Sequence, residues 1–143
     1  MGDSLQLYGV YLFVGDMTAT LDFYRRLGLA IDEVSEMFAR AELESGINIE
    51  FGTAELTRSY DRRWSQPPGP GTNTINFELA SRDAVDAMYD DLTASGHGGH
   101  MAPIDAIWGA RFALLHDPDG NVVGLHSPRD RERERANEAG STS

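Results

Sequence analysis

Cysteine and lysine are both missing from this 143-residue sequence. Without cysteine, the chain has no disulfides, thiolate metal sites or cysteine nucleophiles. Its apolar runs are all far shorter than the roughly 20 residues that a membrane-spanning helix needs. The first residues also lack the basic and apolar regions of a signal peptide. We therefore expect a cytoplasmic protein with no membrane partner.

Positive charge is scarce as well. Twelve arginines stand against 23 acidic residues, which gives a formal net charge of −11. Such a surface repels the phosphates of nucleic acid, so nucleic acid is excluded as a partner. A neutral or cationic small molecule suits this charge better.

A strand–helix pattern occurs twice. Residues 9–14 alternate as a strand, and either Asp16 or Thr18 is placed to cap a helix that ends at Gly28. Three short strands are expected next, around 30–34, 38–42 and 47–51. Five positions then recur 65 residues later: Val10, Leu12, Val14, Tyr24 and Leu27 match Ile75, Phe77, Leu79, Tyr89 and Leu92.

The repeat predicts an α+β fold of two βαβββ modules. Each module is too small to bury its own sheet, so two must combine, within one chain or between two. We expect the modules at residues 1–57 and 73–128, joined by a linker at 58–72 that holds three of the six prolines. Residues 129–135 alternate arginine with acid, and the rest of the tail to 143 is small and polar. The tail suits a solvated helix or a disordered segment, and we expect disorder.

Three stretches resemble the vicinal oxygen chelate superfamily, which includes glyoxalase I, bleomycin-resistance proteins and extradiol dioxygenases. They are LFVGDM leading into LDFYRRLGL, then NFEL, and finally HDPDGNVV. The resemblance covers about residues 5–128. It implies a curled mixed sheet around a cup-like cavity, with the helices on the convex side, in a homodimer.

The resemblance also implies where a metal would bind. Metal-using members take one ligand from the first and one from the last strand of each module, and these positions correspond to Gly9, Glu50, Thr74 and Gly124. Glycine has no side-chain donor, and a threonine hydroxyl is a poor ligand for a transition metal. One carboxylate is too few, so we expect no metal and no other cofactor.

The four histidines do not replace the missing ligands. His97 and His100 are expected as solvated residues of a loop, and His116 and His126 lie toward opposite ends of the last hairpin. His126 shares the cavity face with Gly124, where it would contact a ligand, act as a base or serve structure.

An organic guest would therefore meet side chains of the curled sheet and its loops. Each tryptophan is either a stacking surface for a planar ligand or a seal for the core edge. Inward glutamates would favour a cationic guest, unless one of them pairs with arginine. The candidate ligand-binding residues are Tyr11, Phe38, Asn48, Glu50, Tyr60, Trp64, Asn76, Glu78, Met101, Trp108, Arg111 and His126.

Three functions fit this reading. We prefer a metal-independent binding protein of the bleomycin-resistance kind, which sequesters a planar or cationic drug-like natural product. The second is a metal-free lyase or isomerase that uses Glu50, Glu78 or His126 as its general base. The third is a metal-dependent lyase or dioxygenase with unorthodox ligands.

Overall fold

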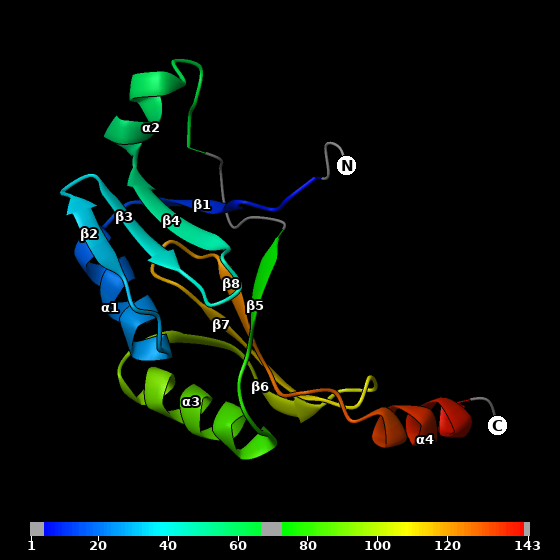
Figure 1. The fold of residues 1–143 in the computed structure, drawn as a ribbon. Helices are drawn as coiled ribbons and strands as arrows, with labels where there is room; N and C mark the ends of the chain where they lie inside the picture. Colours follow the sequence, from blue (N-terminus) through cyan, green and yellow to red (C-terminus); the bar gives the residue numbers. More distant parts are fainter. Residues whose placement is uncertain (1–4, 67–72, 142–143) are drawn as a thin grey trace. The chain divides into compact units, whose positions relative to one another are not determined.

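A computed structural model describes residues 5–66 and 73–141, with side chains up to residue 139. The chain divides into two compact units, Met1–Pro68 (unit 1) and Gly69–Ser143 (unit 2). Each unit contains a four-stranded mixed sheet (Figure 1). None of the described helices is long and apolar enough to cross a membrane.

Unit 1 consists of five sheet-and-helix elements followed by a short helix. These are β1 (Gly9–Val14), α1 (Met17–Leu27), β2 (Asp32–Ser35), β3 (Phe38–Glu42), β4 (Asn48–Thr53) and α2 (Ala54–Tyr60). The strand order is β1-β4-β3-β2, with β1 parallel to β4. Of the two capping residues considered, Asp16 begins α1 by accepting a bond from the Ala19 N–H at 3.1 Å.

Unit 2 repeats this arrangement and adds a helix at its end. Its elements are β5 (Thr74–Glu78), α3 (Arg82–Ala94), β6 (Gly98–Asp105), β7 (Arg111–His116), β8 (Val122–His126) and α4 (Arg131–Ser141). The order β5-β8-β7-β6 has the same form as that of unit 1, and β5 is parallel to β8. The α+β class and the two βαβββ modules are thereby confirmed.

Period-two alternation places an apolar layer between each sheet and its long helix. In unit 1 the buried Ile49 and Phe51 of β4 lie on one sheet face, where Phe51 packs 5.1 Å from the ring of Tyr24 in α1. In unit 2, Leu115 and Leu125 are fully buried on the face that α3 covers. The alternate residues of the same strands point to the opposite side of the sheet, which we call the open face. Glu50 is on the open face of unit 1 and Gly124 on that of unit 2.

The predicted hairpin between β7 and β8 is held by one buried carboxylate. Asp117 accepts hydrogen bonds at 2.9 Å from the backbone N–H groups of Asp119 and Asn121, and from the Asn121 side chain. Gly120 has a φ of +85°, a conformation that glycine adopts without a Cβ penalty. The turn therefore fixes the register of the last two strands.

Three segments differ from expectation. The region expected as a linker from residue 58 begins inside helix α2, because Thr53 caps that helix through a bond from the Leu56 N–H. The loop expected around His100 is part of β6. The tail expected to be disordered forms α4, the helical alternative; residues 67–72 of the linker lie outside the described part of the chain.

Candidate functional site

An ion pair lies at the centre of the open face of unit 1. Tyr11 of β1, Glu50 of β4 and Arg40 of β3 stand side by side in the strand register. Arg40 Nε lies 3.4 Å from Glu50 Oε2, and the Glu50 side chain is 17% exposed. The guanidinium of Arg40 also lies 5.3 Å from the ring centre of Phe38. The one carboxylate at a position that the resemblance implies for a metal is thus paired with an arginine.

Tyr11 is oriented by a chain of hydroxyl groups. Its oxygen lies 2.9 Å from Thr57 Oγ1, and Thr57 donates its own proton to the Thr53 carbonyl oxygen. Since a threonine hydroxyl has one proton, the Tyr11 hydroxyl must donate to Thr57. Burial raises the pKa of Tyr11 above its usual value, and the nearby Tyr60 and Glu50 add to this. The phenol is therefore held in its protonated form beside Thr57 and Tyr60.

Aromatic rings from α2 and from the segment after it pack on two neighbouring open-face residues of β1, Tyr11 and Phe13. Tyr60 meets Tyr11 edge to face at 6.4 Å, and Trp64 lies 4.8 Å from Phe13. Arg58 lies 5.4 Å from the Trp64 ring centre. Gly52 provides the space for the phenol, because a Cβ at this position would be 1.6 Å from the Tyr11 hydroxyl oxygen. The open face of unit 1 thus presents aromatic rings beside the hydrogen-bonded ion pair of Arg40 and Glu50.

Asn48 stands at the first position of β4. It is only 8% exposed, and its amide lies 3.4 Å from the Tyr8 carbonyl oxygen, which it binds as a donor. This bond ties the start of β4 to the segment before β1. We assign Asn48 to strand pairing.

The open face of unit 2 carries an indole–imidazole pair. Trp108 Nε1 donates to His126 Nε2 at 2.8 Å, so the neutral imidazole carries its proton on Nδ1. Phe112 packs edge to face against both rings, at 5.3 Å from Trp108 and 5.8 Å from His126. Glu78 stands directly opposite His126 in the parallel register. Trp108 therefore has a fixed orientation, and the Nε2 lone pair of His126 is in use.

Asn76 and Met101 stand in the same cross-strand row of the unit 2 sheet. The Arg111 side chain, in contrast, is not on the open face. Asn76 lies over Gly124, where a Cβ would be 1.9 Å from the Asn76 Oδ1. Met101 pairs with Leu114 in the neighbouring strands. Arg111 points to the α3 side: its Nε donates to Asp86 at 2.8 Å and its Nη1 to Asp105 at 3.3 Å. Among the described residues, neither Glu50 nor Glu78 pairs with Arg111, which instead links β7 to α3 and β6.

The two histidines of β6 and β7 form a pair that sequence reasoning missed. His100 Nδ1 and His116 Nε2 are 3.1 Å apart, because the antiparallel strands bring the two rings together. Two imidazoles are fewer than the three protein ligands of a typical catalytic zinc site. Within residues 5–66 and 73–141, no group of three His, Asp or Glu residues could hold a metal ion.

The four positions implied for a metal do not fit one. Gly9 and Gly124 offer no side-chain donor, and the space beside Gly124 is filled by the Asn76 amide. Thr74 offers a neutral hydroxyl, and Glu50 is ion-paired with Arg40. Divalent transition metals need several imidazole or carboxylate ligands. This donor set therefore does not suit the family's metal chemistry.

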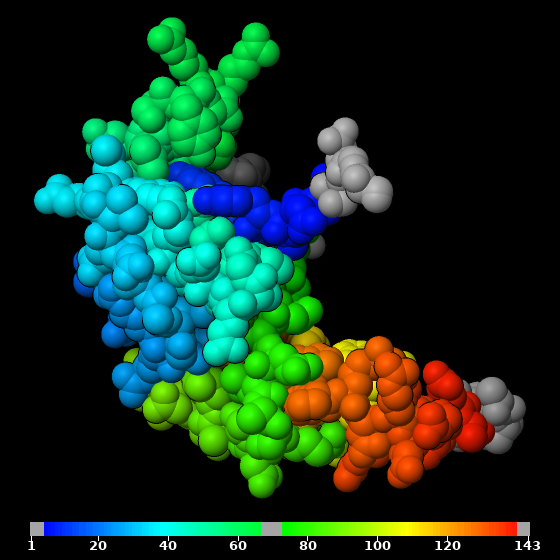
Figure 2. Space-filling model, viewed as in Figure 1, coloured from blue at the N-terminus to red at the C-terminus, as the bar shows by residue number. Residues whose placement is uncertain are grey.

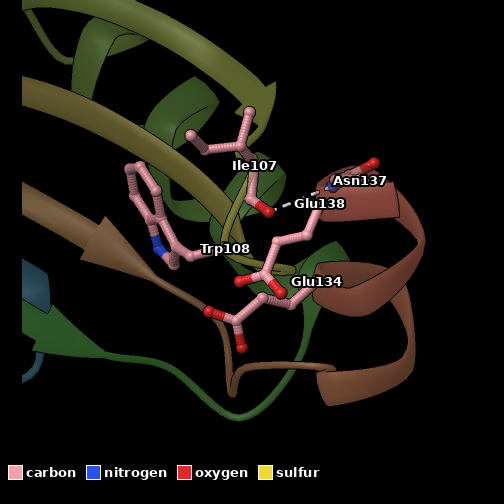
Figure 3. Close-up of a pocket in the computed structure, with 5 residues that line it drawn as sticks. All are labelled: Ile107, Trp108, Glu134, Asn137 and Glu138. Atoms are coloured by element: carbon pink, nitrogen blue, oxygen red, sulfur yellow. Dashed lines mark hydrogen bonds between the residues drawn. The ribbon is translucent and has the colours of Figure 1, made fainter. Parts of the chain in front are cut away.

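A cavity of about 190 Å³ lies elsewhere in unit 2, between the β6–β7 loop and α4 (Figure 3). Trp108 is the one predicted residue among its five lining residues; the others are Ile107, Glu134, Asn137 and Glu138. The sequence signal for the last three was their i, i+3, i+4 spacing, which puts them on one face of a helix. This spacing is informative only if the tail is helical, and disorder is the alternative that the sequence favours there.

Comparison with known proteins now adds to this geometry. The family model of the Glyoxalase/Bleomycin resistance protein/Dioxygenase superfamily matches residues 6–125. The chain belongs to this superfamily. The resemblance noted in the sequence is thereby confirmed, and α4 lies beyond the matched residues. None of the curated proteins matches the chain significantly.

Solved structures share the fold of this superfamily member. A glyoxalase-related enzyme from Fulvimarina pelagi superposes with a TM-score of 0.76 at 18% identity, covering 86% of this chain and 88% of its own. A glyoxalase/bleomycin resistance protein/dioxygenase family enzyme from Burkholderia phytofirmans PsJN has a TM-score of 0.76 at 24% identity, covering 86% and 98%. A protein of unknown function from Agrobacterium tumefaciens has a TM-score of 0.70 at 29% identity, covering 89% and 97%.

Proposed function

We propose that this superfamily member is a metal-independent binding protein of the bleomycin-resistance kind, which sequesters a drug-like natural product without changing it. One observation carries the proposal. Of the four strand positions that supply metal ligands in the family, only Glu50 has a strong donor, and Arg40 holds it in an ion pair. The residues that remain are suited to contact with an organic guest.

The aromatic groups of unit 1 support a planar guest. Tyr60 is 65% exposed, so a flat ligand gains apolar contact by covering it. Tyr11 contributes an oxygen that accepts hydrogen bonds, since its own proton is donated to Thr57. A planar compound carrying N–H donors or a positive charge matches this combination, and the net charge of −11 favours its approach.

A matched pair of tyrosines tests the site. Tyr8 and Tyr60 are exposed to a similar degree, 62% and 65%, but only Tyr60 contacts Tyr11. A thermal-shift screen with planar aromatic cations, their neutral analogues and planar acids should select a cation. Tyr60→Ala should then reduce the shift, and Tyr8→Ala should not.

Chemical analysis of the selected compound separates binding from catalysis. Mass spectrometry after long incubation with the protein should recover the compound unchanged and in stoichiometric complex. Conversion to a product would overturn the proposal. Equal loss of binding in Tyr8→Ala and Tyr60→Ala would reject the proposed location.

A metal-free enzyme is the second candidate, favoured by the carboxylate–imidazole neighbours Glu78 and His126. Such a pair is typical of general acid–base sites. Its difficulty is that Trp108 occupies the His126 Nε2 lone pair. If turnover is found, Glu78→Gln and Glu50→Gln should be compared. The substitution that abolishes turnover identifies the general base.

A further inference from the structure

The cavity between Trp108 and α4 has a composition that suits a positively charged ligand. Its walls are one indole, one isoleucine, one amide and two carboxylates, and none of the five lining residues is basic. Its volume of about 190 Å³ is below the roughly 300 Å³ of pockets for drug-sized ligands. The space therefore suits a small compound rather than a bulky natural product.

The indole wall is rigid. Trp108 donates its Nε1–H to His126 and packs against Phe112, so the ring cannot turn away from the cavity without losing both contacts. The face of an indole attracts cations through its quadrupole, more strongly than any other side chain. One wall of the cavity thus offers a fixed surface for an ammonium group.

The opposite wall is a helix face held at defined points. Asp130 accepts bonds from the backbone N–H groups of Glu132 and Arg133, which begins α4, and its own N–H donates to the Gly109 carbonyl. Further along, the Asn137 amide donates to the Ile107 carbonyl oxygen at 3.2 Å. These bonds attach α4 to the loop that carries Trp108, although most of the helix surface is open to solvent (Figure 2).

The carboxylates stand on this attached face. Glu134 and Glu138 are one helical turn apart, and Figure 3 shows both side chains directed from α4 toward the indole. Arg129 binds both oxygens of Glu134 at 2.6 Å, so an ammonium group in the cavity would share this carboxylate with a guanidinium. Carboxylate oxygens accept hydrogen bonds, so they favour an ammonium group that still carries protons.

We propose that this cavity is a second binding site, selective for a small primary ammonium compound with a short apolar chain. The ammonium lies between the Trp108 ring and the carboxylates of Glu134 and Glu138, and the chain contacts Ile107. The site does not depend on the function proposed for the sheet face, because three of its residues come from α4, outside the residues that match the family.

Titration of the full chain with n-butylammonium tests the site, with n-butanol and butyrate as neutral and anionic controls. The indole N–H resonance of Trp108, identified in a Trp64→Phe background, reports on binding. We expect it to shift saturably with butylammonium and not with either control. Raising the salt from 0.02 to 0.5 M should weaken the binding, because the carboxylates are near the surface.

Two matched substitutions in α4 locate the ligand. Glu138→Gln should weaken butylammonium binding about three- to fivefold, as for a partly exposed charge pair. Glu132→Gln removes the same charge from the same helix, but Glu132 does not line the cavity, so binding should be unchanged. Circular dichroism of both variants checks that α4 persists.

Several outcomes would overturn the proposal. These are an absence of any shift, equal shifts with butanol, and equal weakening by Glu132→Gln and Glu138→Gln. None of them bears on the planar guest of unit 1, which is tested through Tyr60 and Tyr8. The two proposals therefore fail independently.

Discussion

Units 1 and 2 share a strand order and a pairing register, yet their open faces carry different chemistry. The pair Tyr11–Glu50 in unit 1 occupies the place of Asn76–Gly124 in unit 2, and Phe13–Gly52 occupies that of Glu78–His126. Unit 1 thus has an ion pair among phenol rings, whereas unit 2 has an imidazole bonded to an indole. The sequence repeat specifies the strand pairing and the buried apolar layer of each unit. It does not specify which side chains stand on the open face.

The two units also end differently. Helix α2 of unit 1 follows β4 directly and supplies Thr57 and Tyr60 to the open face. Helix α4 of unit 2 attaches to the β6–β7 loop and forms a cavity with Trp108. Helices α2 and α4 therefore each place side chains beside their unit that the repeated part does not supply.

The largest expected difference between the units concerns the repeated tyrosine. Tyr24 is fully buried against Phe23 and Phe51, whereas its counterpart Tyr89 is half-buried. We expect Tyr24→Ala to lower the free energy of unfolding by about 3–5 kcal/mol, and Tyr89→Ala by about half as much. Urea denaturation measures both. Equal losses would mean that the two helices pack alike.

The next largest effect on stability is expected from replacing an open-face glycine by alanine, Gly52 in unit 1 and Gly124 in unit 2. In Gly52→Ala the new Cβ meets the rigid Tyr11 ring, so the phenol must move and lose Thr57. We expect a loss of about 1–3 kcal/mol. Gly124→Ala meets the end of the short Asn76 side chain and should cost less than about 1 kcal/mol.

A second substitution checks that cause. If the Tyr11 ring is the obstacle, the cost of Gly52→Ala should largely vanish in a Tyr11→Ala background, again measured by urea denaturation. An undiminished cost would assign the effect to the backbone at residue 52 instead.

A smaller effect concerns alkaline pH. Tyr11→Phe removes the hydrogen bond to Thr57 and should cost about 0.5–1.5 kcal/mol at neutral pH. Because burial raises the pKa of Tyr11 in the folded state, its contribution is fully present below the unfolded pKa of about 10. It is lost as the pH rises through the folded pKa.

Comparison of the parent and Tyr11→Phe proteins isolates this contribution. The urea midpoints of the two should differ by a constant amount below about pH 10 and converge as the pH rises above it through the raised folded pKa. A separation that stayed constant over that rise would contradict the raised pKa.

The smallest effect is at acid pH and belongs to unit 2. Backbone N–H groups, that of Arg133 first, hold the pKa of Asp130 below its usual 3.8. The carboxylate therefore stabilises the start of α4 above the unfolded pKa, and this stabilisation is lost as the pH falls through the folded pKa. Circular dichroism should show helix loss in that range.

Asp130→Asn provides the control for α4, because asparagine caps a helix without a charge that titrates. Its helix content should be insensitive to acid over the same range, whereas Asp130→Ala should lose helix at every pH. If the asparagine variant keeps the acid dependence of the parent, another group is responsible.

Much of this architecture was predictable because it depends on local signals. The alternating runs around Val10 and Ile75, the capping residues Asp16 and Ser81 and the turn at Gly120 all act through neighbours in the chain. The scarcity of metal donors at Gly9 and Gly124 follows from the sequence once the strands are aligned. The sequence left helix α4 as one of two alternatives and favoured disorder, because contacts that stabilise the helix, such as Asn137 to Ile107, join residues 30 positions apart.

The amino-acid sequence by itself determined the two modules, the alternation that separates a buried from an open face, and the residue types at the four positions implied for a metal. Only the tertiary structure decided that Glu50 pairs with Arg40, that Arg111 faces α3, and that Trp108 is held by His126 opposite α4. The physical reason is that backbone geometry repeats with a short period along the chain. Side-chain partners are chosen by which distant strands and loops come within hydrogen-bonding distance.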